Sequence, residues 1–351
     1  MCGRRARRNG KTSAGHRRFL CITCRYSFIR QRHIPVNFSD FTNFYDFIIN
    51  KINKAALSEK TFLSRKSIWR KFKPFFRYSP TSFDSLFLLN KSFKAKSIKH
   101  WVLGIDGKWL KRKGVIMIYR DITRKINLYW SYHPSESFYA LENDFINLKL
   151  IIKESLKNNL PLGVVTDWKK ALVSYVNIFF PYSFHQRCLT HIKRQLTRLL
   201  PLKSPILATR DLRVVAQKII NIENKKDKTL WKKEIEKWIK DYGFLLKEKT
   251  IGINTKKKWW YTHGNLRRAI RLLTFDEKYL FAYLNTPFLP KTNNSLEGLN
   301  SQIKTKLSNH RGMKVSQQVS FIFWFLTFKR VKNKKDLKQL WDRLKNKIFR
   351  F

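Results

Sequence analysis

Acidic residues are scarce in this chain of 351 residues, which has 23 Asp and Glu against 74 Lys and Arg and a formal net charge of +51. A charge of this size repels itself unless a polyanion neutralises it, and the natural polyanion is nucleic acid. Hydrophobic residues make up 43% and aromatic residues 15% of the chain, which is enough core material to argue against wholesale disorder. The composition predicts two or three compact units that bind nucleic acid.

Long apolar runs and cysteines are also few. The longest apolar run, residues 319–328, is too short to span a bilayer, and no signal peptide precedes the predicted fold, so we expect no membrane partner. Four cysteines, three of them near the N-terminus, do not make a disulfide framework. This cysteine usage is typical of a protein in a reducing cytoplasm.

The three N-terminal cysteines lie in a basic segment, because residues 1–35 carry ten Lys and Arg and no acid. Cys21 and Cys24 have the spacing of a zinc knuckle, and Cys2 lies at a distance that a short hairpin would close. Structural zinc takes four ligands, so the fourth would be His16, His33 or a cysteine ahead of the first residue. The other interpretation is a pair of exposed thiols without metal. The neighbouring aromatic residues favour a zinc-ribbon-like segment that is one cysteine short.

Residues 40–78 have the pattern of a helix-turn-helix. Apolar residues follow helical spacing over Asp40–Ile52, and Leu57–Phe72 is typical of a helix, a tight turn and a second helix with Ser64 as its N-cap. The alternative is an ordinary helical hairpin with a solvated basic face. As a DNA-binding motif, the second helix would present four cations to a DNA groove: Arg65, Lys66, Arg70 and Lys71.

The middle of the chain has the pattern of an α/β protein, and residues 99–204 form the first part of a predicted catalytic core. The expected elements are strands at 101–106, 115–119 and 126–132, a helix at 139–153, a strand at 162–166, a helix at 168–179, a short strand at 182–184 and a helix that carries His191. Three antiparallel strands continued by parallel strands and crossover helices predict an RNase H-like mixed sheet.

The regions on either side of this core have different patterns. The polar stretch at 79–98 is predicted to be a linker, and strand patterns disappear after residue 204. We therefore expect an all-helical insertion over 205–288, followed by C-terminal helices of the core over 289–351.

Three acids occur at the ends of predicted elements in this acid-poor chain. Asp106 ends Trp101-Val-Leu-Gly-Ile-Asp106, and Asp167 ends Leu162-Gly-Val-Val-Thr-Asp167. Glu297 opens a helix in Thr292-Asn-Asn-Ser-Leu-Glu297-Gly298-Leu-Asn300. Acids at strand ends, joined by one from a helix, can hold two divalent cations for phosphodiester chemistry.

Each acid also has an ordinary structural explanation. Asp106 with Gly107 is a common turn pair, and Asp167 ahead of a helix is a common N-cap. Glu297, three residues after Asn294, resembles a capping box. The joint occurrence of three such acids within one RNase H-like order favours a catalytic triad that holds two Mg²⁺ or Mn²⁺ ions.

Cys188 and His191 lie between the second and third acids, three residues apart on one helix face. They could form half of a zinc site, although no further ligands are evident nearby in sequence. A structural pair that positions the active site or packs the helical insertion is the favoured interpretation.

These residues together resemble bacterial insertion-sequence transposases of the Mutator-like superfamily, which carry a DDE triad on an RNase H-like fold. The resemblance covers nearly the whole chain and implies Asp106, Asp167 and Glu297 as metal ligands. The chain differs from the pattern of that superfamily at two places. Trp168 stands where such proteins often have Gly, and the first cysteine of the ribbon is missing. The motifs that carry it are the N-terminal Cys21-Ile-Thr-Cys24 ribbon, Ile105-Asp106-Gly107, Thr166-Asp167, His185-Gln-Arg-Cys188-Leu-Thr-His191, Thr292 to Asn300 and His310-Arg-Gly-Met313.

The resemblance implies a DNA transposase that binds the terminal inverted repeats of an element, cleaves there and joins the liberated 3′-OH to target DNA. It further implies a homo-oligomer on double-stranded DNA and a bacterial cytoplasm, in association with the nucleoid. Three alternatives stay open: a DNA-binding protein without a metal site, an RNase H-class nuclease, and a decayed or domesticated transposase that only binds DNA.

Overall fold

The computed structural model describes residues 5–13, 15, 17–29, 36–50, 52–94, 100–111, 113–252, 258–310 and 312–349. The chain divides into two compact units, Met1–Pro74 and Phe75–Phe351.

The first unit begins with a small antiparallel sheet of order β1-β2-β3, formed by β1 (Ala6–Lys11), β2 (Arg17–Cys21) and β3 (Ser27–Ile29). Cys21 is buried at the end of β2, whereas Cys24 is exposed in the following turn. Cys2, His16 and His33 lie outside the described residues. Within the described residues no group of three possible metal ligands includes Cys21 or Cys24, so the zinc ribbon stays a prediction.

Three helices follow: α1 (Phe38–Ile49), α2 (Lys54–Thr61) and α3 (Arg65–Arg77), whose residues from Phe75 onward belong to the second unit. The hydroxyl of Ser64 accepts a hydrogen bond from the Ser67 amide at 3.1 Å, which confirms Ser64 as the N-cap of α3. Phe44 and Phe47 of α1 pack against Phe72 of α3. These aromatic contacts hold the two helices together, as the helical spacing predicted.

The prediction of a linker over residues 79–98 is wrong for most of that segment. A short 3-10 helix at Phe83–Ser85 leads into α4 (Leu86–Lys94). Leu89 and Phe93 of α4 are buried in the same core as the central sheet. The apolar residues of α4 are Leu86–Leu89 and Phe93, and the polar residues between and after them made the segment resemble a linker.

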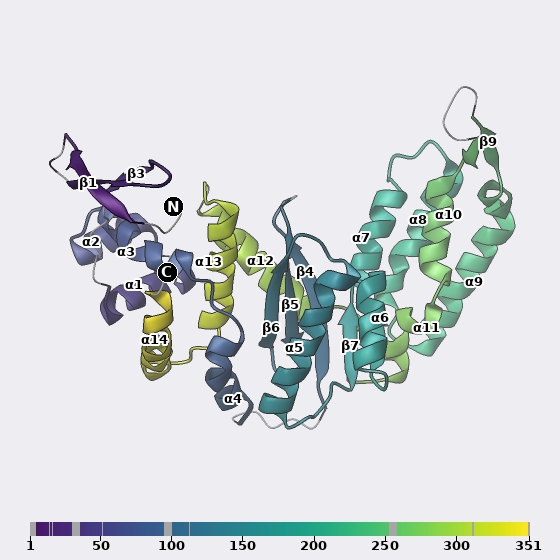
Figure 1. Ribbon diagram of the computed structural model, residues 1–351. Coiled ribbons are helices and arrows are strands. Elements are labelled where there is room, and N and C mark those ends of the chain that lie inside the picture. The colour runs from purple at the N-terminus through teal and green to yellow at the C-terminus, as the bar shows by residue number, and fades with distance from the viewer. Residues whose placement is uncertain are drawn as a thin grey trace. The chain divides into compact units, whose positions relative to one another are not determined.

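The second unit is built on a five-stranded sheet of order β6-β5-β4-β7-β8 (Figure 1). β4 pairs antiparallel with β5 and β5 with β6, while β7 runs parallel to β4 and β8 parallel to β7. This order is compatible with the predicted RNase H-like fold, although the fifth strand begins two residues later than predicted. The strands are β4 (Val102–Trp109), β5 (Val115–Asp121), β6 (Ile126–His133), β7 (Gly163–Thr166) and β8 (Phe184–Arg187).

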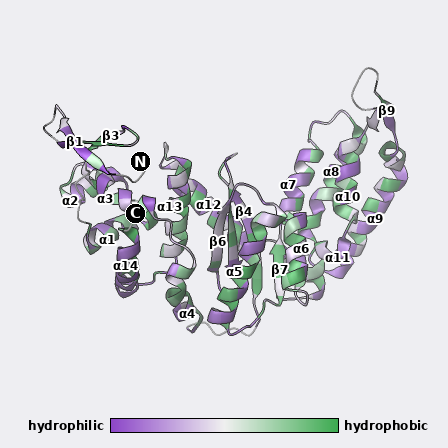
Figure 2. Ribbon diagram, in the orientation of Figure 1, coloured by the Kyte–Doolittle hydropathy of each residue, from purple (hydrophilic) through white to green (hydrophobic). Residues whose placement is uncertain are grey.

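Helices cover the sheet on both faces. α5 (Phe138–Leu156) and α6 (Lys170–Phe179) share one hydrophobic core with β4, β5, β6 and β7. α12 (Asn294–Ser308) contacts β4, and α13 (Val315–Phe328) contacts β6; α12 lies behind the sheet in Figure 1. The chain ends in α14 (Lys334–Ile348). Figure 2 shows hydrophobic residues gathered in the strands, as expected for a sheet buried on both faces.

Residues 189–285 form a mainly helical block with a second hydrophobic core. The prediction that residues 205–288 are all helical is wrong in one place, because β9 (Lys249–Ile251) pairs antiparallel with β10 (Trp259–Tyr261). Strands of three residues are too short to produce a periodic pattern, although their β-branched and aromatic residues favour strands. The helices are α7 (Leu189–Leu199), α8 (Leu207–Gln217), α9 (Lys225–Tyr242), α10 (Gly264–Thr274) and α11 (Glu277–Leu280), with 3-10 turns at Lys218–Asn221, Gly243–Leu246 and Ala282–Asn285.

Candidate active site

The three acids proposed as a triad come from three elements that meet at one end of the sheet. Asp106 lies in β4, Asp167 directly follows β7, and Glu297 lies in the first turn of α12. β4 and β7 are parallel neighbours in which Gly104 is paired with Val165. Asp106 and Asp167, each two residues further along, therefore occupy equivalent positions on adjacent strands.

The three carboxylates interact electrostatically. Burial raises the pKa of Asp106 to about 6, and the negative charge of Glu297 contributes to the increase. Burial, together with the charge of Asp106, also raises the pKa of Asp167. Negative charges that are close together and shielded from water repel one another. Such carboxylates therefore bind protons or a metal cation more readily than exposed ones do.

The ordinary structural explanations for these acids do not hold. Asp106 is not in a turn, because β4 continues for three residues beyond it. The N-cap of α6 is Lys169, so Asp167 does not cap that helix. The N-cap of α12 is Asn293, which makes no side-chain capping hydrogen bond, so Glu297 belongs to no capping box. Asp167 does accept a hydrogen bond from the Lys169 amide at 3.4 Å in the turn that leads into α6. Asp106 and Glu297 have neither the turn nor the capping role that the sequence suggested.

Close packing of α12 against β4 brings Glu297 near Asp106, and Gly104 permits it. A Cβ atom at Gly104 would lie 2.6 Å from Oδ1 of Asn293 and 3.2 Å from Cδ1 of Leu296. Any larger residue would push the start of α12 away from the strand. One turn further along α12, Asn300 donates from Nδ2 to Oδ2 of Asp106 at 2.8 Å, which fixes the second turn of the helix as well.

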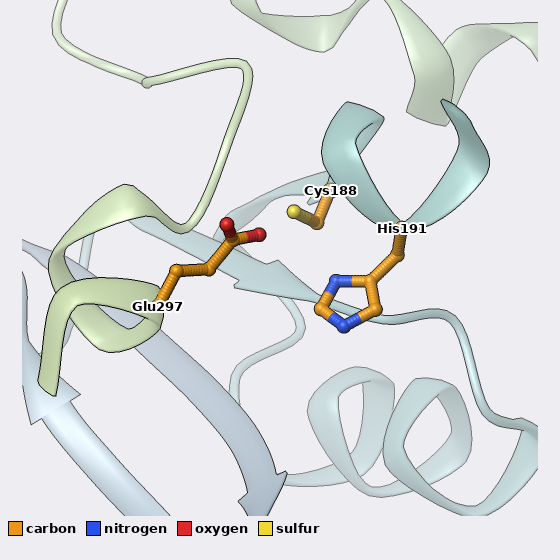
Figure 3. Close-up of side chains that lie close together, drawn as sticks. All are labelled: Cys188, His191 and Glu297. Carbon is orange, nitrogen blue, oxygen red and sulfur yellow. The ribbon is translucent and has the colours of Figure 1, made fainter. Parts of the chain in front are cut away.

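Cys188 and His191 belong to the same cluster. Their sulfur and ring nitrogen lie with a carboxylate oxygen of Glu297 so that all three atoms are within 4.8 Å of one another. Figure 3 shows the three side chains pointing toward one another from α12 and the start of α7. His191 Nε2 is also 3.8 Å from Oδ1 of Asp106. Burial lowers the pKa of His191, which keeps its ring neutral and able to bind a cation at neutral pH.

Cys188 also has a structural role, as the sequence suggested. Its sulfur accepts a hydrogen bond from the Asn293 amide at 3.4 Å. The neighbouring Leu189 amide donates to the carbonyl of Lys291 at 3.0 Å. These two bonds attach the segment that leads into α12 to the start of α7. Cys188 therefore helps to set the position of Glu297.

Asp106 and Glu297 line a hollow of about 400 Å³, whose other lining residues include several cations. Arg194 of α7 pairs with Oε2 of Glu297 at 3.0 Å and is half exposed. Lys108 of β4 and Lys304 of α12 also line the hollow, and burial together with the charge of Lys304 lowers the pKa of Lys108. Acids at the floor with cations around them suit a phosphodiester that approaches a bound cation.

Sequence analysis did not identify Glu136 as a neighbour of the candidate site. Its side chain is only 4% exposed and forms an ion pair with Lys169, whose ammonium is 3.6 Å from Asp167. A Cβ at Gly107 would collide with the Glu136 carboxylate, which places this fourth acid beside the residue after Asp106. No sequence signal identified it, because residues 134–137 lie between β6 and α5 without any pattern.

The four cations predicted to enter a DNA groove do not share one environment. Arg65, Lys66 and Arg70 are exposed on α3. Lys71 instead pairs with Asp40 of α1 at 2.8 Å, and only 24% of its side chain is exposed. The helix face available to DNA is therefore formed by the first three residues, and Lys71 serves to join two helices.

Part of the candidate site lies in a segment that matches the model of a known protein family. Residues 173–305 match the model of the transposase IS66 family. This segment includes Cys188, His191 and Glu297 but neither Asp106 nor Asp167. The match supports an insertion-sequence transposase, an enzyme class that acts on DNA, and gives no support to the Mutator-like assignment because the two groups are distinct. A comparison with curated proteins found no match.

Within the described ranges, every helix is too short or too polar to cross a bilayer.

Proposed function

We propose that this chain is a DDE transposase in which Asp106, Asp167 and Glu297 hold two Mg²⁺ or Mn²⁺ ions. The observation that supports the proposal is the placement of the three acids: Asp106 in β4, Asp167 after the parallel neighbour β7, and Glu297 at the start of α12, which contacts β4. None of the three caps a helix. The family match over residues 173–305 supports the same enzyme class. The finer Mutator-like assignment stays a prediction.

The donor set fits hard divalent cations. Oε1 of Glu297 and Oδ1 of Asn300 are buried and have no hydrogen-bond partner within the described part of the chain. Unpartnered buried oxygens cost free energy unless a cation or ordered water satisfies them. Bound cations of this kind would activate a water or 3′-hydroxyl and stabilise the leaving oxygen of an in-line displacement.

The chain's own residues would orient the acids and the DNA. Asn300 donates a hydrogen bond to one oxygen of Asp106, and Arg194 forms an ion pair with one oxygen of Glu297. The other oxygen of each carboxylate does not take part in that contact. Lys108 and Lys304 line the hollow where the scissile phosphate would lie. Their positive charge would attract the phosphate and offset the repulsion between it and the acids.

The first unit would recognise the ends of the element. Arg65, Lys66 and Arg70 are exposed on one helix, where they can reach phosphates and base edges. Zn²⁺ bound by Cys2, Cys21 and Cys24 would stabilise the ribbon, with double-stranded DNA as partner and a homo-oligomer assembled on it. These roles are parts of the proposal.

The test uses DNA that carries the element's own terminal repeats. Replacing Asp106, Asp167 or Glu297 by Ala should each abolish cleavage and joining in Mg²⁺ or Mn²⁺. DNA binding should persist, because it depends on Lys and Arg contacts to phosphates. Cleavage without joining in the wild-type protein would indicate a nuclease instead. A folded Glu297→Ala protein that still joins DNA at the normal rate would rule out the triad.

A further inference from the structure

A cavity of about 730 Å³ is lined by Trp168, the residue after Asp167, and is separate from the hollow that Asp106 and Glu297 line. Its walls come from α6, α7, α10 and the residue that follows Asp167. The volume is within the range of roughly 300–1,000 Å³ that is usual for sites of one small organic ligand. The cavity therefore suits a single nucleotide and is too small for a duplex.

Trp168 forms the wall nearest the acids and is held firmly. Its backbone has φ of +72°, a conformation that non-glycine residues rarely adopt. The indole contacts the rings of His185 and Tyr279, with centroids 5.0 and 4.5 Å away. These contacts hold a large flat side chain at the cavity wall immediately after a proposed catalytic acid.

Arg187, at the end of β8, links the cavity to the acids. Only 5% of this residue is exposed, and its Nε atom has no hydrogen-bond partner within the described residues. Its guanidinium lies 5.7 Å from the centre of the Trp168 ring and interacts electrostatically with Asp276, which also lines the cavity, and with Asp167. A buried guanidinium with an unused donor points to an acceptor that enters the cavity from outside.

The outer rim adds further positive charge and aromatic surface. Arg198, Arg268 and Arg271 are exposed around the opening, and for the described residues no ion pair to any of them is found. Phe275 is 53% exposed at the same rim, with Arg271 5.1 Å from the centre of its ring. Asp276 is the one acid among the described lining residues. Exposed aromatic rings beside unpaired arginines are typical of surfaces that bind unpaired nucleotides.

We propose that this cavity binds one unpaired nucleotide of the DNA strand that passes the acids. The base would stack on the aromatic walls formed by Trp168 and Phe275. Arg187 would donate to the base or its phosphate, and the rim arginines would hold the adjacent phosphates. The inference deepens the proposed function, because it assigns a position to the strand next to the scissile phosphate.

The test compares two DNA probes, a blunt duplex and the same duplex with a single-stranded overhang of two nucleotides. Affinities are measured by fluorescence anisotropy in EDTA at about 0.2 M salt, where nonspecific phosphate contacts are weakened. The wild-type protein should bind the overhang probe about tenfold more tightly, as expected for one stacked base. Trp168→Ala should remove this preference and leave affinity for the blunt probe unchanged.

A second variant guards against loss of folding at the partly buried Trp168. Arg268→Ala with Arg271→Ala changes only exposed side chains and should weaken binding of the overhang probe more than of the blunt probe. Lys237→Ala with Lys240→Ala, on the exposed surface of α9, removes the same charge and should weaken both probes equally. Equal losses on both probes in the arginine variant, or an overhang preference retained by folded Trp168→Ala, would overturn the proposal.

This experiment tests the nucleotide site separately from the proposed catalytic function. Binding in EDTA does not require the acids, so an overhang preference is expected even if Asp106, Asp167 and Glu297 are not catalytic. If those acids prove essential and the preference is absent, the nucleotide site alone is wrong.

Discussion

Asn300 and Asp106 are joined by a hydrogen bond of 2.8 Å although 194 residues separate them. The bond connects the second turn of α12 to the central strand of the sheet. Asn300 is also on the same face of α12 as Glu297, one turn earlier. One amide thereby sets the distance between two of the three acids, and several expectations depend on that geometry.

Asn300→Ala should slow DNA joining about tenfold, because groups that orient metal ligands typically contribute this much or more. The variant frees Oδ2 of Asp106 and leaves all three acids present. DNA affinity should not change. Single-turnover joining rates provide the measurement, with Ser301→Ala as control because Ser301 lines the same hollow. Equal rates in the two variants would show that Asn300 does not position the site.

The crowded acids predict a pH effect on the stability of the metal-free protein. The pKa of Asp106 is raised from 3.8 to about 6 in the folded state. A raised pKa contributes stability that is fully present below the unfolded value and is lost as pH rises through about 6. Between pH about 5 and about 7.5, ionisation of this carboxyl should lower the free energy of unfolding by about 1 kcal/mol.

The measurement is urea unfolding in EDTA at both pH values, for wild type and Asp106→Asn. Asn cannot ionise, so the variant should lose about 1 kcal/mol less than the wild type over this interval. The charge of Asp106 also raises the pKa of Asp167, so Asp167 should titrate closer to its ordinary range in the variant, which enlarges the difference between the two proteins. An identical pH dependence in the two proteins would mean that Asp106 titrates normally.

The proximity of Cys188, His191 and Glu297 predicts inhibition by zinc. Zn²⁺ prefers sulfur and nitrogen ligands, so it should bind this group and take Glu297 from the Mg²⁺ site. Cys188→Ser can still accept the Asn293 hydrogen bond, but it should weaken Zn²⁺ binding about tenfold or more. Competition with a colorimetric chelator measures this affinity. Undiminished zinc binding by the variant would leave Cys188 with a structural role only.

DNA recognition by α3 gives a prediction for the first unit. Arg65→Ala with Arg70→Ala should reduce specific binding to element ends while weaker, salt-sensitive binding largely remains. Lys71→Ala is the matched control, because Lys71 pairs with Asp40 and should affect stability more than DNA affinity. Footprinting on terminal-repeat DNA distinguishes them. Unchanged end preference in the double variant would exclude α3 as the recognition helix.

Much of the sheet was predictable because its strands are continuous β-branched or aromatic runs. Such runs identified β4 and β7, and Asp167 directly follows β7 as predicted. The prediction that Asp106 ends its strand is wrong, because β4 continues to Trp109. The hairpin of β9 and β10 was missed because three-residue strands have no period. α4 was missed because polar residues separate Leu88 and Leu89 from Phe93, the other buried residue of this short helix.

Contacts between distant segments were beyond reach of sequence patterns. Nothing in the sequence pattern indicated Glu136, and only the fold brings it to Lys169 beside Asp167. Lys71 appeared equivalent to Arg70, and only the packing of α1 shows that it pairs with Asp40. The pairing of a long-range partner depends on tertiary structure, whereas periodicity reports only which face of an element is apolar.

Equilibrium binding of Mn²⁺ tests the central claim most directly, because it measures whether the three acids form one cation site. Free Mn²⁺ can be followed by its electron paramagnetic resonance signal in wild type, Asp106→Asn, Asp167→Asn and Glu297→Gln. Glu234→Gln, on the exposed surface of α9, is the matched control. We expect each site variant to bind Mn²⁺ at least about tenfold more weakly, with the control unchanged. Wild-type Mn²⁺ affinity in Glu297→Gln would contradict the account.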